Sequence, residues 1–365
     1  MKEDIISVVL SALVGLVFAF LVMPFLLKFC RLKGFYDKPN ERKVHKNAIP
    51  RLGGVIFMPA MLIGLLVYLF VGTNGFQGHF TLRTSSILMA IGAFLIYVIG
   101  IVDDLVSMKA THKFVIQLVA AAIMPFCWLH INNFYGLFGL YELPLWFSYP
   151  FTVFVILLVV NSINLIDGID GLSSALCISI LLVYVYLYMQ MEYTMLYAAG
   201  AAALAGALLA FFYYNVFGNA NKGSKTFMGD SGSLFLGYAL AYLSIKYAMD
   251  NPLVIPHRDY ALLLPYTLLI VPTFDVIRVA ITRKLKGMAM FNPDKTHIHH
   301  KVMDAGFSMR QTLFIILGLF LLFCAINYTL YACCVDAMWI VLIDVLVFSL
   351  FIKVMNVMAK RRAQL

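Results

Sequence analysis

The sequence predicts an all-α protein that crosses a membrane many times. Of its 365 residues, 62% are hydrophobic and 12% are charged, whereas soluble domains carry about 25% charged residues. The hydrophobic residues gather in windows of the length, about 20 residues, that a helix needs to cross a bilayer. The alternating polarity of membrane β-strands, in segments of about ten residues, is not seen.

Eleven apolar windows follow one another along the chain. Each predicts one transmembrane helix, at residues 5–29, 53–72, 84–102, 114–131, 147–166, 172–191, 195–217, 229–248, 261–282, 312–332 and 335–356. The fourth and fifth windows are the least regular, because Pro125 and Pro144 lie near their ends. We therefore expect the whole chain, residues 1–365, to be a single transmembrane domain.

The basic residues predict how these helices are oriented. Of the 27 Lys and Arg, 20 fall on the side of the odd-numbered loops and the C-terminal tail, and three (Lys2, Arg83 and Arg258) fall on the other side. Lys and Arg favour the cytoplasmic side, so the N-terminus is expected outside and the C-terminus in the cytoplasm. The net charge of +9 then suits anionic lipid headgroups or phosphorylated substrates and gives no reason to invoke nucleic acid.

Five polar segments interrupt the apolar sequence, and all of them fall on the predicted cytoplasmic side, in the first, third, fifth, seventh and ninth loops. They are KVHKNAIPRLGG (43–54), DDLVSMKATHKFVIQ (103–117), NSINLIDGIDGL (161–172), NKGSKTFMGDSGS (221–233) and FNPDKTHIHHKVMDAG (291–306). Polar side chains at membrane depth are costly and usually face a binding site or a cavity. We expect the five segments to meet in one water-facing active site.

The acidic residues at predicted helix ends each have a structural alternative. Asp103 and Asp104 end the third window, where a solvated helix end is the alternative; adjacent carboxylates repel, and a helix C-terminus disfavours them. Asp230 stands at a helix start, where capping of the helix explains an Asp equally well.

The fifth and ninth loops also allow two interpretations. Asn164 and Asp167 fall on one helix face, which favours a ligand site over simple capping of the backbone. Gly168 is expected to break the helix after them. The histidines of the ninth loop are less typical of a zinc site, because zinc requires spaced ligands in a closed shell and the neighbours His299 and His300 cannot easily face one ion.

Carboxylates and amide oxygens with nearby Lys and His predict a site for a hard cation and phosphate. Mg²⁺ binds one or two protein oxygens together with substrate phosphates and stabilises charge in phosphoryl transfer, while Lys and His neutralise the remaining phosphate charge. The residues alone therefore predict metal-assisted phosphoryl transfer between a soluble donor and a membrane lipid. An ion-coupled transporter is the alternative from another class; it would place polar groups near the bilayer midplane, often with internal repeats, and neither feature is present.

The ordered motifs DD…KFxxQ, NxxNxxDGxDGL, FMGDSGSL and NPDxxHIHH resemble those of the polyprenyl-phosphate N-acetylhexosamine-1-phosphate transferases, over nearly the whole chain. The resemblance implies transfer of N-acetylhexosamine 1-phosphate from a UDP-sugar to undecaprenyl phosphate, with release of UMP and with Mg²⁺ or Mn²⁺ as cofactor. The product would be the first lipid-linked intermediate of a cell-envelope polysaccharide, made in the bacterial plasma (inner) membrane. The oligomeric state stays open, and a homodimer is one candidate.

The resemblance also implies roles for individual residues. The implied catalytic residues are Asp103, Asp104, Lys113, His299 and His300. The implied metal ligands are Asn164 and Asp230. The implied contacts to the nucleotide sugar are Lys46, Arg51, Asp167, Asp170, Phe227 and His297, with Phe227 stacked on the uracil.

The ninth loop distinguishes two branches of this family. The phospho-MurNAc-pentapeptide transferases of peptidoglycan synthesis have three consecutive His followed by an aromatic residue and Glu, whereas here Lys301 takes the third position and Val302 follows. Arg51 agrees, because the peptidoglycan branch has Thr there. The sequence thus resembles the N-acetylglucosamine-1-phosphate branch and favours UDP-N-acetylglucosamine as donor, with the peptidoglycan enzyme as the alternative.

Overall fold

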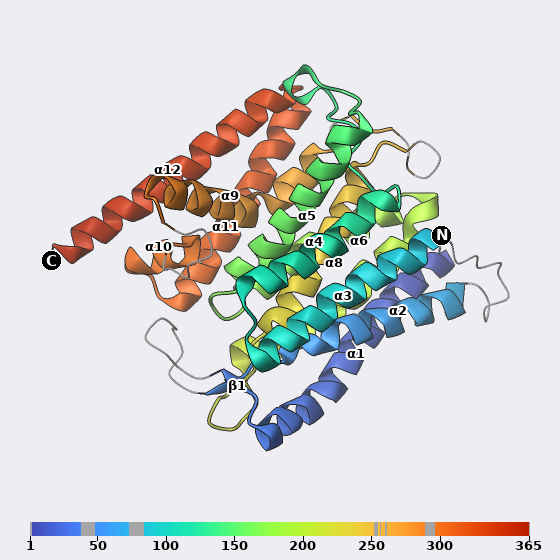
Figure 1. Cartoon of the computed structure of the whole chain (residues 1–365), viewed down its shortest axis with the longest axis vertical. Coiled ribbons are helices and arrows are strands. Elements are labelled where there is room, and N and C mark those ends of the chain that lie inside the picture. The colour runs from blue at the N-terminus through green and yellow to red at the C-terminus, as the bar shows by residue number, and fades with distance from the viewer. Residues whose placement is uncertain are drawn as a thin grey trace.

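The computed structural model describes residues 2–37, 48–72, 84–251, 255, 257–259, 261–288 and 296–364. Within them the chain forms a bundle of long helices (Figure 1). The helices are α1 (Lys2–Lys33), α2 (Phe57–Gly72), α3 (Thr84–Val106), α4 (Ala110–Phe126), α5 (Leu145–Ile166), α6 (Leu172–Met189), α7 (Met195–Phe212), α8 (Gly229–Ala248), α9 (Leu263–Leu285), α10 (Ile298–Asp304), α11 (Met309–Ala332) and α12 (Ala337–Ala363).

The remaining elements are short. They are the two-residue strands β1 (Tyr36–Asp37) and β2 (Ile49–Pro50), the 3-10 turns η1 (Gly53–Ile56), η2 (Leu137–Gly139) and η3 (Glu192–Thr194), and the π-helical turn η4 (Tyr213–Phe217). The two strands pair antiparallel with each other. An all-α fold is therefore confirmed.

Each of the eleven apolar windows contains one long helix, in the predicted order. Within the described residues, nine helical segments are long and apolar enough to cross a membrane. Two of the predicted windows correspond to helices outside these nine segments. They are α4, which has 17 residues, and α8, which carries Asp230 near its start and Lys246 near its end. A polytopic membrane protein is thus confirmed, while the number of eleven spans and the orientation stay predictions.

The prolines noted in the sequence mark helix ends. Pro125 lies in the last turn of α4, and Pro144 is the residue before α5, with the extended backbone that Pro favours there. The glycine-rich turn at residues 167–171 separates α5 from α6, as predicted. Gly171 takes a positive φ of 81°, a conformation that glycine adopts without steric cost.

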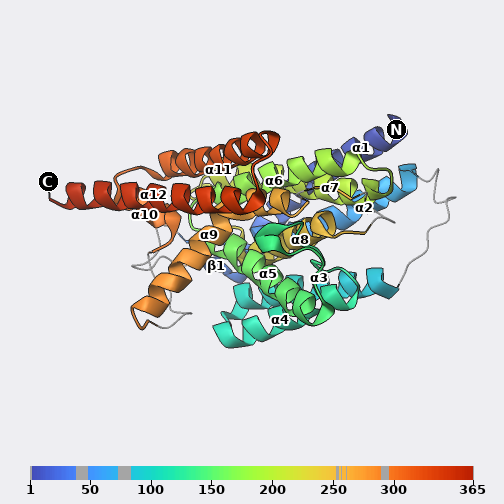
Figure 2. The same ribbon diagram turned by 90° about the horizontal axis from the view of Figure 1, so that it is seen from above.

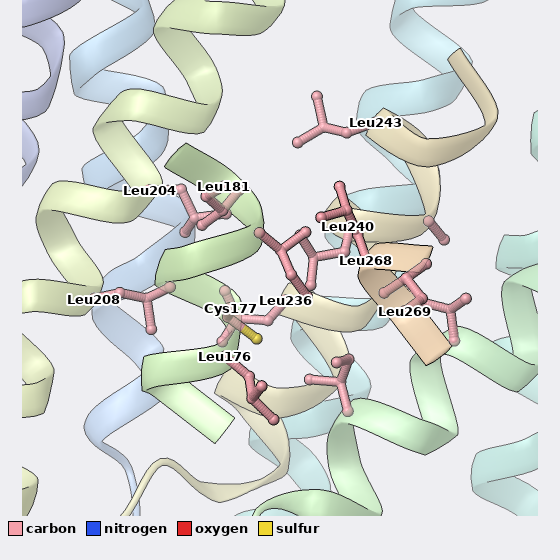
Figure 3. Packing of buried hydrophobic residues seen from close by; sticks show 14 of the residues in the cluster. Leu176, Cys177, Leu181, Leu204, Leu208, Leu236, Leu240, Leu243, Leu268 and Leu269 are labelled. Carbon is pink, nitrogen blue, oxygen red and sulfur yellow. The ribbon is translucent and has the colours of Figure 1, made fainter. Parts of the chain in front are cut away.

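The centre of the bundle is formed by α6, α7, α8 and α9, whose leucines point toward one another (Figure 3). Leu181, Leu204 and Leu240 are at most 1% exposed. Because lipid tails are as apolar as leucine, close van der Waals packing rather than exclusion of water holds such helices together.

Small residues allow α1 to lie directly against α7. A Cβ built on Gly15 would stand 2.2 Å from the carbonyl oxygen of Ala203, and a Cβ on Gly206 would stand 2.1 Å from that of Ala12. Helices in membranes use such small residues to bring their backbones together. The pair α11 and α12 lies on the side of the bundle away from α4 (Figure 2).

A buried polar contact joins α9, α11 and α12. The Asn327 side-chain amide donates hydrogen bonds to Thr267 Oγ1 at 2.8 Å and to Asp344 Oδ2 at 3.0 Å. All three side chains are less than 9% exposed.

Successive helices run in opposite directions, so their polar termini gather at one end of the bundle. We call this the polar end and define it by Asp103, Asn164, Asp230 and His299; β1 and α10 also lie there (Figure 1). The opposite end holds the start of α5 and the end of α8.

Candidate active site

The carboxylate of Asp104, in the last turn of α3, caps the first turn of α8. Its Oδ1 accepts a hydrogen bond from the backbone amide of Asp230 at 2.8 Å, and its Oδ2 accepts one from that of Ser231 at 2.9 Å. Helix N-termini carry unpaired amides and partial positive charge, which favour a carboxylate. Asp104 is 6% exposed, so within the predicted acidic pair it is the member that positions α8.

Asp103, the other member of the pair, faces the site. Its Oδ1 accepts a hydrogen bond from the Met108 amide at 2.8 Å, and its Oδ2 lies 3.7 Å from Lys113 Nζ. Lys113 Nζ also donates to Asp230 Oδ2. One ammonium group therefore lies between two carboxylates that come from α3 and α8, as the predicted convergence of the third and seventh loops requires.

Asn164, in the last turn of α5, approaches Asp230 from the other side. Its side-chain nitrogen donates hydrogen bonds to Asp230 Oδ1 at 3.1 Å and to Ser233 Oγ at 2.8 Å. The two predicted metal ligands are thus neighbours. Ser233, which the sequence analysis did not single out, holds the Asn164 amide.

These oxygens suit Mg²⁺ bound jointly by protein and substrate. The described residues contain no group of three or more His, Cys, Asp or Glu side chains arranged to hold a metal ion. Mg²⁺ does not need one, because it usually binds one or two carboxylates together with water and substrate phosphates. Oxygens of this kind are offered by Asp103, Asn164 and Asp230. In the structure, the ammonium group of Lys113 neutralises the two carboxylates. The cofactor itself stays a prediction.

Arg51 binds the C-terminus of α3. Its Nε donates to the backbone carbonyl of Asp104 at 2.7 Å, and its Nη2 lies 3.2 Å from Ser107 Oγ. The last carbonyls of a helix lack helical partners and carry partial negative charge, which a guanidinium group satisfies. Arg51 therefore has a structural role at α3, and its contact with the nucleotide stays a prediction. Lys46 lies outside the described residues.

The turn between α5 and α6 carries Asp167 and Asp170 in different environments. Asp170 Oδ2 forms an ion pair with Lys225 Nζ at 2.5 Å, which ties this turn to the loop before α8. Asp167 is partly buried and forms no hydrogen bond or ion pair within the described part of the chain. Burial, with the nearby charge of Asp170, raises the pKa of Asp167 to about 7, a shift typical of functional carboxyl groups.

Asn215 joins the same two loops from the π-helical turn η4. Its Oδ1 accepts a hydrogen bond from the Gly171 amide at 2.7 Å, and its Nδ2 donates to the Thr226 carbonyl at 2.9 Å. Turns of π-helix often occur at functional sites. Asn215 was not among the residues expected from the sequence, although a single Asn inside an apolar window indicates a functional position.

The backbone on both sides of Phe227 is fixed by the first loop. The Phe227 amide donates to the Pro50 carbonyl at 2.8 Å, and the Gly53 amide donates to the Phe227 carbonyl at 3.0 Å. Phe227 itself is partly exposed. A rigid backbone and an accessible ring suit the stacking role that the resemblance implies.

The ring of His299 lies directly against the turn after α5. A Cβ built on Gly168 would stand 2.2 Å from His299 Nε2, so glycine at this position makes the approach possible. Burial, together with the neighbouring His300 and His297, lowers the pKa of His299 to about 3. His299 is therefore neutral before substrate binds, and its Nδ1 is buried without a hydrogen-bond partner in the described structure.

Asp275 of α9 positions His297 and the start of α10. Its Oδ2 lies 2.8 Å from His297 Nδ1, and its Oδ1 accepts hydrogen bonds from the Ile298 amide at 3.0 Å and from Arg278 at 2.6 Å. Asp275 is 2% exposed. Asp275 was not among the residues expected from the sequence, although an Asp within the ninth apolar window is a costly polar residue at membrane depth.

An apolar groove with a volume of about 400 Å³ runs between α5 and α9, with part of α8 as its wall. Along α5 it extends from Phe147 to Val159, and along α9 from Leu263 to Ile277. One end of the groove therefore lies near the opposite end of the bundle. The other end lies close to the polar end, near Asn164 and Asp275. Such a groove can hold a segment of a long hydrocarbon chain beside the polar site.

Carboxylates, lysines and histidines gathered at one end of a membrane bundle, beside a hydrocarbon-sized groove, define a membrane-embedded transferase site. Residues 86–248 match the family model described as glycosyl transferase family 4. Over 317 residues the chain is 32% identical to a probable undecaprenyl-phosphate N-acetylglucosaminyl 1-phosphate transferase of Bacillus subtilis (strain 168), covering 87% of this chain and 83% of that protein.

Two further relatives carry a similar name, undecaprenyl-phosphate alpha-N-acetylglucosaminyl 1-phosphate transferase. The protein of Yersinia pestis is 30% identical over 78% of this chain and 73% of its own length. That of Escherichia coli (strain K12) is 28% identical over 86% of this chain and 80% of its own length. The chain therefore belongs to glycosyl transferase family 4 and is a glycosyl-1-phosphate transferase, a multi-pass protein of the bacterial membrane.

Proposed function

We propose that this enzyme transfers N-acetylglucosamine 1-phosphate from UDP-N-acetylglucosamine to undecaprenyl phosphate and releases UMP. An oxygen of the lipid phosphate attacks the β-phosphorus of the donor. The bond from this phosphorus to the oxygen that bridges the two donor phosphates breaks, and UMP leaves with that oxygen. The names of the relatives support this choice of acceptor and sugar.

The observation that carries the proposal is the cluster of Asp103, Lys113, Asn164 and Asp230 at the polar end, close to the end of the apolar groove. The cluster offers oxygen ligands and an ammonium group for phosphates. The groove offers space for the part of the isoprenoid chain next to the phosphate, and the phosphate would then lie at the level of Asn164. A single site can thus hold a water-soluble donor and a membrane-bound acceptor.

Mg²⁺ would be held by Asn164 and Asp230, with Asp103 nearby, and would supply neutralisation of phosphate charge. Lys113, which lies between Asp103 and Asp230, would neutralise a substrate phosphate beside them. Neutral His299 is suited to donate a hydrogen bond to a phosphate or sugar oxygen, and Asp275 holds its neighbour His297 in place.

The donor nucleotide is proposed to bind between the turn after α5 and the loop before α8. Phe227 offers its ring to the uracil, while the pair of Asp170 and Lys225 and the contacts of Asn215 hold the two loops together. Asp167, next to this pair and without a hydrogen-bond partner among the described residues, is available for a hydroxyl group of the donor.

For the chemical step we favour direct attack by the lipid phosphate, with Asp103 as the base. A phosphate monoester has a second pKa of about 6, so near neutral pH it is already an anionic nucleophile. A covalent intermediate on an Asp would follow the logic of double displacement, but it removes no evident barrier. Asp104 is the poorer candidate for either role, because both of its oxygens bind the amides of α8.

The decisive experiment uses purified protein, undecaprenyl phosphate and a panel of radiolabelled UDP-sugars that includes UDP-N-acetylglucosamine, UDP-N-acetylgalactosamine and UDP-MurNAc-pentapeptide. We expect a lipid-linked product and equimolar UMP with UDP-N-acetylglucosamine, and loss of both with Asp103→Asn. Preference for UDP-MurNAc-pentapeptide would instead assign the enzyme to peptidoglycan synthesis. Ion uptake into vesicles without product formation would support a transporter.

A further inference from the structure

A second apolar groove lies away from the active site, between α2 and α3. Its floor is formed by α7 and α8, and its volume is about 240 Å³. Small residues leave the space open, among them Ala93 of α3, Gly200 of α7 and Ala239 of α8. On the rim, Leu62 is 44% exposed, so the groove opens sideways toward the lipid.

Lys246 stands beyond one end of this groove. It lies four residues after Tyr242, a residue of the groove wall, and therefore on the same face of α8. Lys246 Nζ lies 5.4 Å from the ring centroid of Tyr197, another wall residue, and the rings of Tyr197 and Tyr242 are 6.0 Å apart. Two tyrosines and one lysine thus frame the end of an otherwise apolar groove.

Among the described residues, no carboxylate forms an ion pair with Lys246. Its contact with Tyr197 is its one electrostatic contact within the described residues, and the side chain is partly buried. A cation at the end of a membrane helix is stabilised by an anion at the membrane surface, and tyrosine is typical of that level. The groove therefore combines space for a hydrocarbon chain with one unneutralised positive charge at the headgroup level.

We propose that this groove binds an anionic phospholipid, with an acyl chain between α2 and α3 and the phosphate beside Lys246. The site differs from the active site, because Asp230 and Lys246 stand at opposite ends of α8. Sixteen residues separate them, or about 24 Å along a helix. The lipid acceptor of the reaction is a poor occupant, since a phosphate beside Lys246 could not reach the polar end.

The test compares lipid binding by delipidated protein in detergent, using native mass spectrometry with phosphatidylglycerol and with phosphatidylcholine. The variants are Lys246→Gln, which removes the charge, and Gly200→Leu, which fills the groove; a Cβ at Gly200 meets Leu65 at an ordinary 3.4 Å. Lys353→Gln on α12 is the matched control for loss of a lysine. Neither the groove nor Lys246 belongs to the active site, so donor turnover confirms that each variant is folded.

We expect phosphatidylglycerol to bind more tightly than phosphatidylcholine. A basic residue near an anionic lipid surface contributes about 1 kcal/mol, so Lys246→Gln should weaken phosphatidylglycerol about fivefold and leave phosphatidylcholine unchanged. Gly200→Leu should weaken both lipids, and Lys353→Gln neither. Equal binding of the two lipids by the unchanged protein, or an equal loss in Lys353→Gln and Lys246→Gln, would overturn the proposal. A change in oligomeric state without a change in lipid binding would assign the groove to a second copy of the chain instead.

Discussion

Asp104 Oδ1 accepts a hydrogen bond from the backbone amide of Asp230 at 2.8 Å, which joins the end of α3 to the start of α8. Through this contact, one member of the acidic pair positions a residue predicted to bind the metal. The neighbouring Asp103 is directed instead toward Lys113. Adjacent residues of the same type thus have different surroundings, and their substitutions should have different effects.

We expect Asp104→Asn to lower both stability and activity, and Asp103→Asn to lower activity alone. An Asn at position 104 offers one acceptor oxygen to two amides, and loss of a hydrogen bond to a charged group costs about 1.5–3 kcal/mol. Thermal unfolding in detergent and turnover of UDP-N-acetylglucosamine measure the two effects. Equal melting temperatures for the two variants would contradict the capping role of Asp104.

Metal dependence is the second prediction. Turnover should require Mg²⁺ or Mn²⁺, and Asp230→Ala and Asn164→Ala should raise the Mg²⁺ concentration needed for half-maximal rate or abolish turnover. A metal ion supplies several kcal/mol of charge stabilisation, so a loss of about a hundredfold is expected at fixed Mg²⁺. Ser233→Ala, which removes a contact of Asn164 and one to the Gly229 carbonyl but no predicted metal ligand, is the milder control. Full activity of Asp230→Ala or Asn164→Ala in EDTA would exclude the assignment.

Phe227→Ala should raise KM for the UDP-sugar more than it lowers kcat. Stacking on the base serves ground state and transition state alike, and such an interaction affects KM rather than kcat. Base–aromatic stacking contributes about 1–3 kcal/mol, which corresponds to a rise in KM of about tenfold. Phe227→Tyr, which keeps the ring, should behave almost as the unchanged protein. A large decrease in kcat with an unchanged KM would mean that Phe227 does not stack on the uracil of the donor.

The raised pKa of Asp167 predicts a pH-dependent stability. An Asp has a pKa of about 3.9 in an unfolded chain, and burial raises that of Asp167 to about 7 in the folded protein. The folded state therefore binds the proton more tightly, and this contribution to stability is lost as the pH rises from about 4 to about 7. Asp167→Asn removes the effect. The melting temperature of the variant should therefore rise relative to that of the unchanged protein from pH 5 to pH 8.

The measurement is made in EDTA, so that metal binding does not change with pH, and Asp170→Asn serves as the comparison. Titrating groups that do not interact with Asp167 are common to variant and unchanged protein and cancel in the difference. A difference that stays constant over this pH range would show that Asp167 is not responsible.

The last prediction distinguishes the two chemical routes. Direct attack needs both substrates together, so kinetics should be sequential, and labelled UMP should not exchange into UDP-sugar when the lipid is left out. A covalent sugar-phosphate enzyme would allow that exchange. Rapid exchange without lipid, lost in Asp103→Asn, would establish the covalent route and identify the nucleophile.

The apolar windows alone determined the helices. Each window of about 20 residues contains one long helix, because a backbone inside a bilayer must satisfy its own hydrogen bonds. Prolines and glycines set several ends for equally local reasons, as at Pro144 and Gly171. The convergence of the polar segments also followed from sequence, since alternating helices return every second loop to the same end.

The individual contacts at that end were decided by the tertiary structure. The sequence around them does not distinguish Asp103 from Asp104, whereas the amide of Asp230, 126 residues after Asp104, does so. Asp275 and Asn215 escaped notice because each lies inside an apolar window, and the contacts that tie it to the site come from residues of other segments. The neutral state of His299 likewise depends on burial against Gly168. Periodicity and composition are local properties of the chain, whereas burial, capping and charge pairing depend on which helix ends meet.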